Sequence, residues 1–312
     1  MHRPGDLTTT EPGAMQGIAP TGDIGMSANQ ERIRGGTRGG GRLMQELSAI
    51  RAFILRDLDL TKRYLGWDIV WLVYNLINAV IIGLIGISSG AAPEHASGQP
   101  YVFYLLIGAI MWNYLAVLFI IIAETVAWER WEGTLEYTFM APIHRLTHLF
   151  GVCAFATIYG IIRTILMLGI LVVAFDVNLT QANLLSALVV LVIGSFAMVG
   201  LGLIAAVAPL LSPEKGAQAT HILLAVTLLV SGVYYPINVL PDWLQPVAYI
   251  TPAYWALIAE RKAFLEGAPL TALGPELLGL VISGIVFVPL GYLVFSWGER
   301  YAKRVGLLKR SG

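Results

Sequence analysis

The stretch Leu184–Leu211, LLSALVVLVIGSFAMVGLGLIAAVAPLL, contains no charged residue and is long enough to cross a bilayer as a helix. Roughly 20 consecutive apolar residues span the hydrocarbon core of a membrane. The chain contains five further runs of this kind: Leu65–Ser88, Tyr101–Ala127, Leu149–Phe175, Ala219–Tyr235 and Glu276–Trp297. A β-barrel would instead show shorter segments of alternating hydrophobicity. We therefore predict an all-α integral membrane protein with six transmembrane helices.

The composition and the distribution of charge agree with a membrane location. Only 13% of the residues are charged and the mean hydropathy is +0.70, whereas charged residues make up roughly a quarter of a soluble domain. Of the twenty Lys and Arg residues, seventeen fall in the two terminal segments and in the loops on the same side of the six spans. Because positive residues mark the cytoplasmic side, we expect a multi-pass protein of the cell (inner) membrane with both termini in the cytoplasm.

The remaining parts of the chain flank the six-span domain, residues 65–297. Residues 1–42 are rich in Gly, Arg, Thr and Pro, offer no apolar core, and are expected to form a disordered cytoplasmic tail. Residues 43–64 place apolar side chains at three- and four-residue steps beside Arg and Lys, which predicts an amphipathic helix at the membrane interface. Residues 298–312 form a basic cytoplasmic tail.

The stretch Leu240–Leu265 is apolar enough to suggest a seventh span. Its prolines divide it into pieces too short to cross a membrane, because proline breaks the backbone hydrogen-bond ladder. We predict short re-entrant helices on the outer face before the last span, with aromatic side chains at headgroup level. The residues expected to shape this region are Pro236, Pro241, Trp243, Pro252 and Trp255.

Two motifs outside the apolar runs are more specific. Arg130–Pro142, RWEGTLEYTFMAP, is a charged segment between the second and third runs, and Ser231–Trp255, SGVYYPINVLPDWLQPVAYITPAYW, precedes the last run. Together they resemble the permease subunits of ATP-binding-cassette exporters of the type-2 family, which includes drug, lipid and polysaccharide exporters. In that family the first motif reads roughly E-R-E-x-G-T-L-E…P in a cytoplasmic segment, and the second reads S-G-x-x-x-P…L-P on the outer side.

The resemblance implies a cytoplasmic coupling helix that docks onto separate ATPase subunits. The residues that would form it are Glu129, Arg130, Glu132, Gly133, Thr134, Leu135, Glu136 and Pro142. ATP and Mg would be bound by those partner subunits, since this chain has no G-x-x-x-x-G-K-[ST] phosphate loop. We therefore expect no cofactor and no catalytic residue in this chain, and a second permease copy, as a homodimer or a pseudo-symmetric heterodimer, to complete the path.

Polar residues inside the apolar runs are candidates for a cargo path. These are Asn75, Asn78, Trp112, Asn113, Tyr114 and Arg163. Buried amides in a membrane must find partners, so they face protein or a cavity; interhelical hydrogen bonds without a cargo role are the alternative. A charge within a membrane is costly and needs a partner, and Glu124 is the nearest acidic candidate for Arg163.

The cargo and the energy source stay open at this point. The E-G-T-L-E motif favours drug or lipid-like cargo, whereas Arg56–Trp67, RDLDLTKRYLGW, resembles the segment before the first span of O-antigen exporters. An ion-coupled secondary transporter is a candidate of another class. His144 and His148 are spaced i, i+4, but no further ligand completes a recognised metal site. Membrane lipids are expected partners, and nucleic acid is not.

Overall fold

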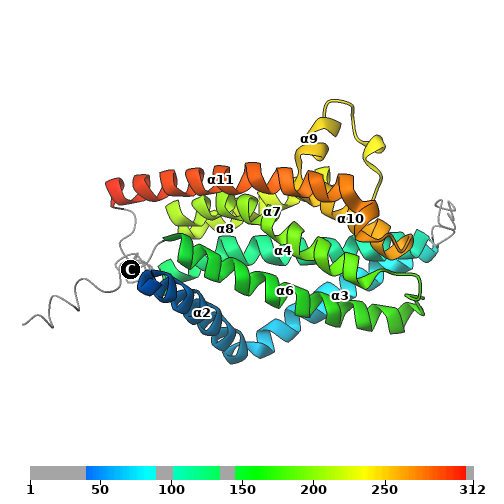
Figure 1. Cartoon of the computed structure of the whole chain (residues 1–312), viewed down its shortest axis with the longest axis horizontal. Helices are drawn as coiled ribbons and strands as arrows, with labels where there is room; N and C mark the ends of the chain where they lie inside the picture. The colour runs from blue at the N-terminus through cyan, green and yellow to red at the C-terminus, as the bar shows by residue number, and fades with distance from the viewer. Residues whose placement is uncertain (1–39, 89–100, 134–144, 307–312) are drawn as a thin grey trace, which may run out of the picture. The chain divides into compact units, whose positions relative to one another are not determined.

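The computed structural model describes residues 40–88, 101–133 and 145–306 (Figure 1). The helix α2 begins in the first of two compact units, Met1–Met44; all contacts given below lie within the second, Gln45–Gly312. In chain order the elements are α2 (Gly40–Arg63), α3 (Leu65–Ser88), α4 (Tyr101–Trp131), α6 (Arg145–Phe175), α7 (Leu184–Leu211), α8 (Pro213–Val230), η1 (Ile237–Val239), α9 (Gln245–Ile250), α10 (Pro252–Leu265), η2 (Leu270–Leu273) and α11 (Gly274–Val305).

Within these residues, five helices are long and apolar enough to cross a membrane: α3, α4, α6, α7 and α11. Their outward faces carry exposed apolar side chains, such as Val173 of α6 and Leu293 of α11, which are 84% and 65% exposed. Such surfaces suit contact with lipid rather than water. The prediction of an all-α, multi-pass membrane protein is confirmed.

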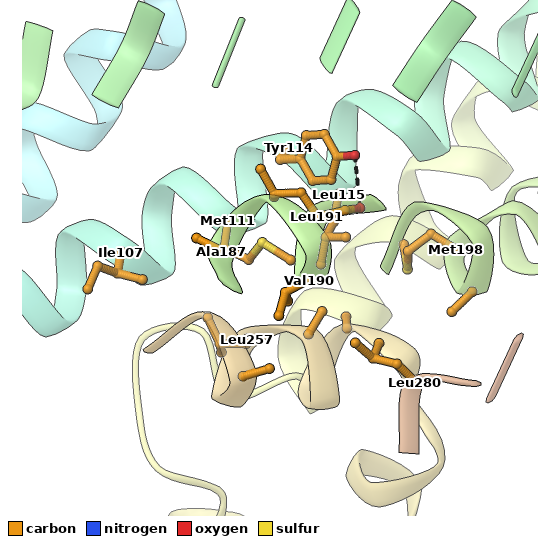
Figure 2. Close-up of a cluster of buried hydrophobic side chains, with 14 of the residues drawn as sticks. Ile107, Met111, Tyr114, Leu115, Ala187, Val190, Leu191, Met198, Leu257 and Leu280 are labelled. Atoms are coloured by element: carbon orange, nitrogen blue, oxygen red, sulfur yellow. Dashed lines mark hydrogen bonds between the residues drawn. The ribbon is translucent and has the colours of Figure 1, made fainter. Parts of the chain in front are cut away.

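The helix α7 lies at the centre of the bundle and packs against α4, α8, α10 and α11. Figure 2 shows Met111 and Leu115 of α4 facing Val190 of α7, with Leu257 and Leu280 closing the same core from α10 and α11. The contact between α7 and α11 is backbone against backbone, because a side chain at Gly200 would overlap the carbonyl of Phe287. Small residues at such crossings allow membrane helices to approach closely.

The helix α8 begins before the predicted span Ala219–Tyr235, at Pro213, and ends before that span does, at Val230. It ends at Val230 because Gly232 adopts a left-handed backbone, with φ +67°, that turns the chain away. At its other end a single residue, Ser212, separates α8 from α7. A side chain at Gly216 would overlap the backbone of Pro209, so this helical hairpin depends on glycine.

The apolar stretch Leu240–Leu265 is divided into α9 and α10, and Pro252 occupies the first turn of α10. The helix α9 lies outside the bundle in Figure 1, and its main contacts are with its neighbours α8, η1 and α10. In contrast, α10 is buried between α4, α7 and α11. Four small side chains on its buried side allow this close packing: Ala253, Ala256, Ala259 and Ala263.

The last helix, α11, extends beyond the predicted span Glu276–Trp297 to Val305. Lys303 and Arg304 occupy its last turn, where positive charge interacts favourably with the helix dipole, and Gly306, with φ +71°, ends it. Residues 298–305 of the predicted basic tail are therefore helical.

Candidate functional site

Four polar side chains join three helices at the end of α4. Arg56 and Asp57 belong to α2, Glu129 to α4 and His148 to α6; we refer to them as the Glu129 cluster. Arg56 donates from Nη1 to Oε1 of Glu129 at 2.8 Å, and its Nη2 lies 2.8 Å from Oδ1 of Asp57. Nε2 of His148 lies 2.9 Å from the same Oε1 atom of Glu129. One carboxylate therefore holds α2 and α6 together.

The electrostatics of the cluster keep Arg56 charged. Burial lowers the pKa of its guanidinium, but the carboxylates of Asp57 and Glu129 outweigh that effect and raise the pKa overall. For Asp57, burial raises the pKa above its ordinary value although Arg56 opposes the shift. Charge-assisted hydrogen bonds of this kind are about twice as strong as neutral ones.

Apolar packing adds to these polar contacts between α2 and α6. The guanidinium of Arg56 lies 5.2 Å from the ring centroid of Phe53, and that ring meets His148 edge-on at 4.7 Å. A side chain at Gly151 of α6 would come within 2.7 Å of Cβ of Phe53, so the two helices touch directly. One helical turn away from Gly151, Thr147 donates a hydrogen bond to Glu46 of α2. The two helices are thus joined at several points.

The cluster borders the segment that the sequence predicts to couple to an ATPase. Glu129 is only 4% exposed and is engaged within the chain, whereas Glu132 is exposed just beyond it. Gly133 follows with a left-handed φ of +72°. Arg130 lies in the last turns of α4. The other coupling residues lie outside the described residues: Thr134, Leu135, Glu136 and Pro142.

Glu129 lies near the end of α4 and His148 near the start of α6, so the two residues flank the segment that the sequence predicts to couple. Arg56 joins this pair to α2, which continues into α3 after the single residue Tyr64. Sequence reasoning identified Glu129 but not its partners. The signal that could have found them is the basic face of the helix at residues 43–64, together with the histidines at the start of α6.

The predicted cargo-path residues fall into two groups. The side-chain amides of Asn75 and Asn78 donate to carbonyls of their own helix, those of Trp71 and Tyr74, at 2.8 and 2.9 Å. Both hydrogen bonds stay within α3, and each uses one of the two N–H groups of the amide.

The α4 residues lie deeper. Tyr114 is fully buried, and its hydroxyl donates to the carbonyl of Leu191 at 3.1 Å (Figure 2) and contacts Ser195. Trp112 and Asn113 are half-buried. In this arrangement Tyr114 joins α4 to α7, and a role of these residues in a cargo path stays a prediction.

Arg163 is buried in α6, and its partner is not Glu124. Its Nη1 donates to the hydroxyl of Tyr159 at 3.1 Å, and that hydroxyl donates to Asp68 of α3 at 2.8 Å. Glu124 instead interacts electrostatically with His221 of α8. The contact with Tyr159 was readable in the sequence, since Tyr159 precedes Arg163 by one helical turn.

The residues predicted to shape the outer face have clear local roles. Pro236 directly precedes η1, and Pro252 is the first residue of α10. The carbonyl of Pro241 accepts the hydrogen bond from Leu244 that starts the turn into α9. Trp243 is 76% exposed. The indole of Trp255 donates to the carbonyl of Tyr249 at 2.8 Å. In the described part of the chain no three His, Cys, Asp or Glu side chains gather as a metal site would require.

Comparison with known proteins identifies the family of this fold. Residues 50–265 match the family model described as ABC-2 type transporter. A relative, the linearmycin resistance permease protein LnrN of Bacillus subtilis (strain 168), is 31% identical over 83 residues. That alignment covers 27% of this chain and only 20% of the relative. Since the family model covers more than half of the sequence, from the middle of α2 to the end of α10, the chain belongs to the ABC-2 type transporter family.

Proposed function

We propose that this chain is the permease subunit of an ATP-driven exporter, in which two copies form the translocation path and separate ATPase subunits supply the energy. The observation that carries this proposal is the position of the Glu129 cluster in a chain of this family. It ties the interface helix α2 to both helices that flank the predicted coupling segment. ATP and Mg would be bound by the partners.

The cluster supports a specific route for the motion. When the ATPase subunits bind ATP, they would displace the segment between α4 and α6. Glu129 and His148 would move with it, and Arg56 would draw α2 along. Since α3 follows α2 after one residue, its tilt would change and alter the path between the two permease copies.

We further propose that α8 is the sixth span. Its 18 residues would extend about 27 Å at 1.5 Å per residue, close to the hydrocarbon thickness of roughly 30 Å. An even number of spans places both basic ends of the chain on one side, which positive residues mark as cytoplasmic. The loop that contains α9 would then lie at the outer face.

For the cargo we favour a drug or lipid-like molecule. The motif at residues 132–136 supports this branch of the family, and the relative is named as a resistance permease. A polysaccharide exporter is the alternative within the same fold. A homodimer is proposed because one chain of six spans forms only one side of a conduit, and two-fold symmetry closes it.

A charge reversal at the coupling segment tests the proposal. Glu132→Lys changes an exposed residue directly after α4, and we expect it to reduce cargo-stimulated ATP hydrolysis of the reconstituted complex about tenfold, as for a truncated interface contact. The matched control is Glu266→Lys, which reverses an exposed charge at the end of α10. Full stimulation in the Glu132 variant would refute docking at this segment.

A further inference from the structure

A pocket of about 280 Å³ lies at the opposite half of α4 from the Glu129 cluster. It is a partly open pocket lined by the start of α4, the loop after α8, and the helices α9 and α10. Four tyrosines line it together with polar side chains that include an arginine and an asparagine: Tyr104, Tyr235, Tyr249, Tyr254, Arg261 and Asn238. None of these residues has a role in the coupling route.

Arg261 is held firmly at this pocket. It is 8% exposed, and its guanidinium carbon lies 3.6 Å from the ring centroid of Tyr104. Its Nη1 donates to the carbonyl of Gly232 at 3.2 Å, and its Nη2 donates to that of Val233 at 2.6 Å. A side chain at Gly108 would come within 2.9 Å of Nη2, so glycine leaves room for this arrangement.

The hydrogen-bonding capacity of Arg261 is not exhausted. A guanidinium carries five N–H donors. Two are used by the backbone carbonyls, and the side chain of Tyr104 also interacts with the guanidinium. The Nε atom is buried and has no hydrogen-bond partner among the described residues. A buried polar group without a partner is costly, which indicates a ligand that accepts hydrogen bonds at this place.

Among the described residues, no carboxylate forms an ion pair with Arg261. Burial lowers its pKa to about 10, so it stays protonated at neutral pH. The preceding residue, Glu260, is buried, and burial raises its pKa well above the ordinary value. The following residue, Lys262, is paired with Glu276 at 2.6 Å. Among the described residues that line the pocket, Arg261 is the one with a charge.

Beside the pocket, the loop that carries α9 presents apolar side chains to the surroundings. Val239, Trp243 and Ile250 are 69%, 76% and 61% exposed. The pocket itself is slightly smaller than typical small-molecule sites, which measure about 300–1,000 Å³. Its size therefore suits the head of a larger molecule, while the neighbouring loop suits an apolar tail.

We propose that this pocket binds the oxyanion head group of an amphiphile, whose apolar part lies against the exposed side chains of residues 239–250. Arg261 supplies the charge, the tyrosines enclose the head group, and the loop contacts the tail. A membrane lipid and an amphiphilic cargo share this chemistry. The inference goes beyond the proposed exporter activity and is tested by binding alone, so its failure would leave that activity unaffected.

Protection of an engineered cysteine tests the proposal in the full-length, detergent-solubilised protein. The sole cysteine, Cys153, is buried and is replaced by serine. Asn238→Cys then places a thiol at the pocket lining. The control is Glu266→Cys, an exposed position at the end of α10 that neither lines the pocket nor belongs to residues 239–250. Maleimide labelling is followed with three probes: dihexanoyl phosphatidate, dihexanoylglycerol without an oxyanion, and inorganic phosphate.

We expect dihexanoyl phosphatidate to slow labelling of the Asn238→Cys protein at least about tenfold and to leave labelling of Glu266→Cys within about twofold. Arg261→Gln should raise the half-protecting concentration about tenfold or more, as the loss of a charged hydrogen bond predicts. Equal protection by dihexanoylglycerol would refute the role of the oxyanion in binding. Equal protection by inorganic phosphate would refute the contribution of the apolar part to binding. Those comparisons keep Arg261 in place, so they hold even if Arg261→Gln fails to fold.

Discussion

The ion pair between Arg56 and Glu129 is the contact on which the coupling route depends, and a double-mutant cycle measures it. The two single variants, Arg56→Gln and Glu129→Gln, each remove one charge. The double variant removes both charges. Hydrogen bonds to charged groups contribute about 1.5–3 kcal/mol. The Arg56 side chain is 33% exposed and that of Glu129 only 5%, so solvent screening places the coupling free energy near the lower end, at about 1.5 kcal/mol.

The assay is the free energy of unfolding of the full chain in detergent micelles, obtained by chemical denaturation of all four proteins. A matched control is the pair Lys262–Glu276, whose atoms lie 2.6 Å apart and whose side chains are similarly exposed, at 38% and 8%. Both cycles should give comparable coupling free energies. Only the Arg56–Glu129 variants should also lose cargo-stimulated ATP hydrolysis, because only they separate α2 from the coupling segment.

Two results would contradict this reasoning. A coupling free energy within about 0.5 kcal/mol of zero is what independent sites show, and it would mean that this pair does not tie α2 to α4. Equal loss of ATP hydrolysis in both cycles would mean that the variants act by general destabilisation. The control pair lies at the other end of the bundle, so it separates transmission from stability.

Three further predictions concern packing, pH and cargo. Gly200→Val should lower the free energy of unfolding by about 1–3 kcal/mol or more, because the valine side chain would overlap the backbone of α11. The control Gly169→Val, on the open side of α6, should have little effect in the same denaturation assay. The pKa of Glu260 is raised in the folded state, so the free energy of unfolding should fall as pH rises from the ordinary glutamate pKa to the raised pKa. The expected slope is about 1.4 kcal/mol per pH unit. The free energy of unfolding of Glu260→Gln, measured across the same pH range, should lack this slope. Asn78→Leu and Trp112→Ala should alter the relative export rates of different cargoes at unchanged expression, and wild-type rates for every cargo would place the path elsewhere.

The spans that the sequence predicted best are those with polar residues at both ends. The bounds of α3 and α7 agree with the predicted runs, because charged or polar residues adjoin them on either side. Hydropathy failed at α8, since Ser231–Tyr235 is apolar in composition but contains Gly232. The left-handed backbone at that residue ends the helix, and a hydropathy average has no access to backbone dihedral angles.

The candidate site was predictable only in part, for a physical reason. A charge beside or within a membrane span must have a partner, so the sequence could indicate that Glu129 and Arg163 are engaged. It could indicate Tyr159, one helical turn from Arg163, but not the distant contacts, because Arg56 lies 73 residues from Glu129, and Tyr159 reaches Asp68 over 91 residues. Such pairs form only when helices far apart in the sequence pack together.

Arg261, whose charge the sequence placed in an outer loop, shows the same limit of sequence pattern. Its neighbours in sequence, Glu260 and Lys262, suggest local pairing, yet Glu260 is buried, with its pKa raised by burial, while Lys262 pairs with Glu276. The fold therefore separates three adjacent charged residues into three environments and leaves the guanidinium of Arg261 at a pocket, where two backbone carbonyls accept hydrogen bonds from it. Within the described residues, an arginine that lines a pocket without an ion-paired carboxylate is a stronger indication of an anionic ligand than any spacing of residues along the chain.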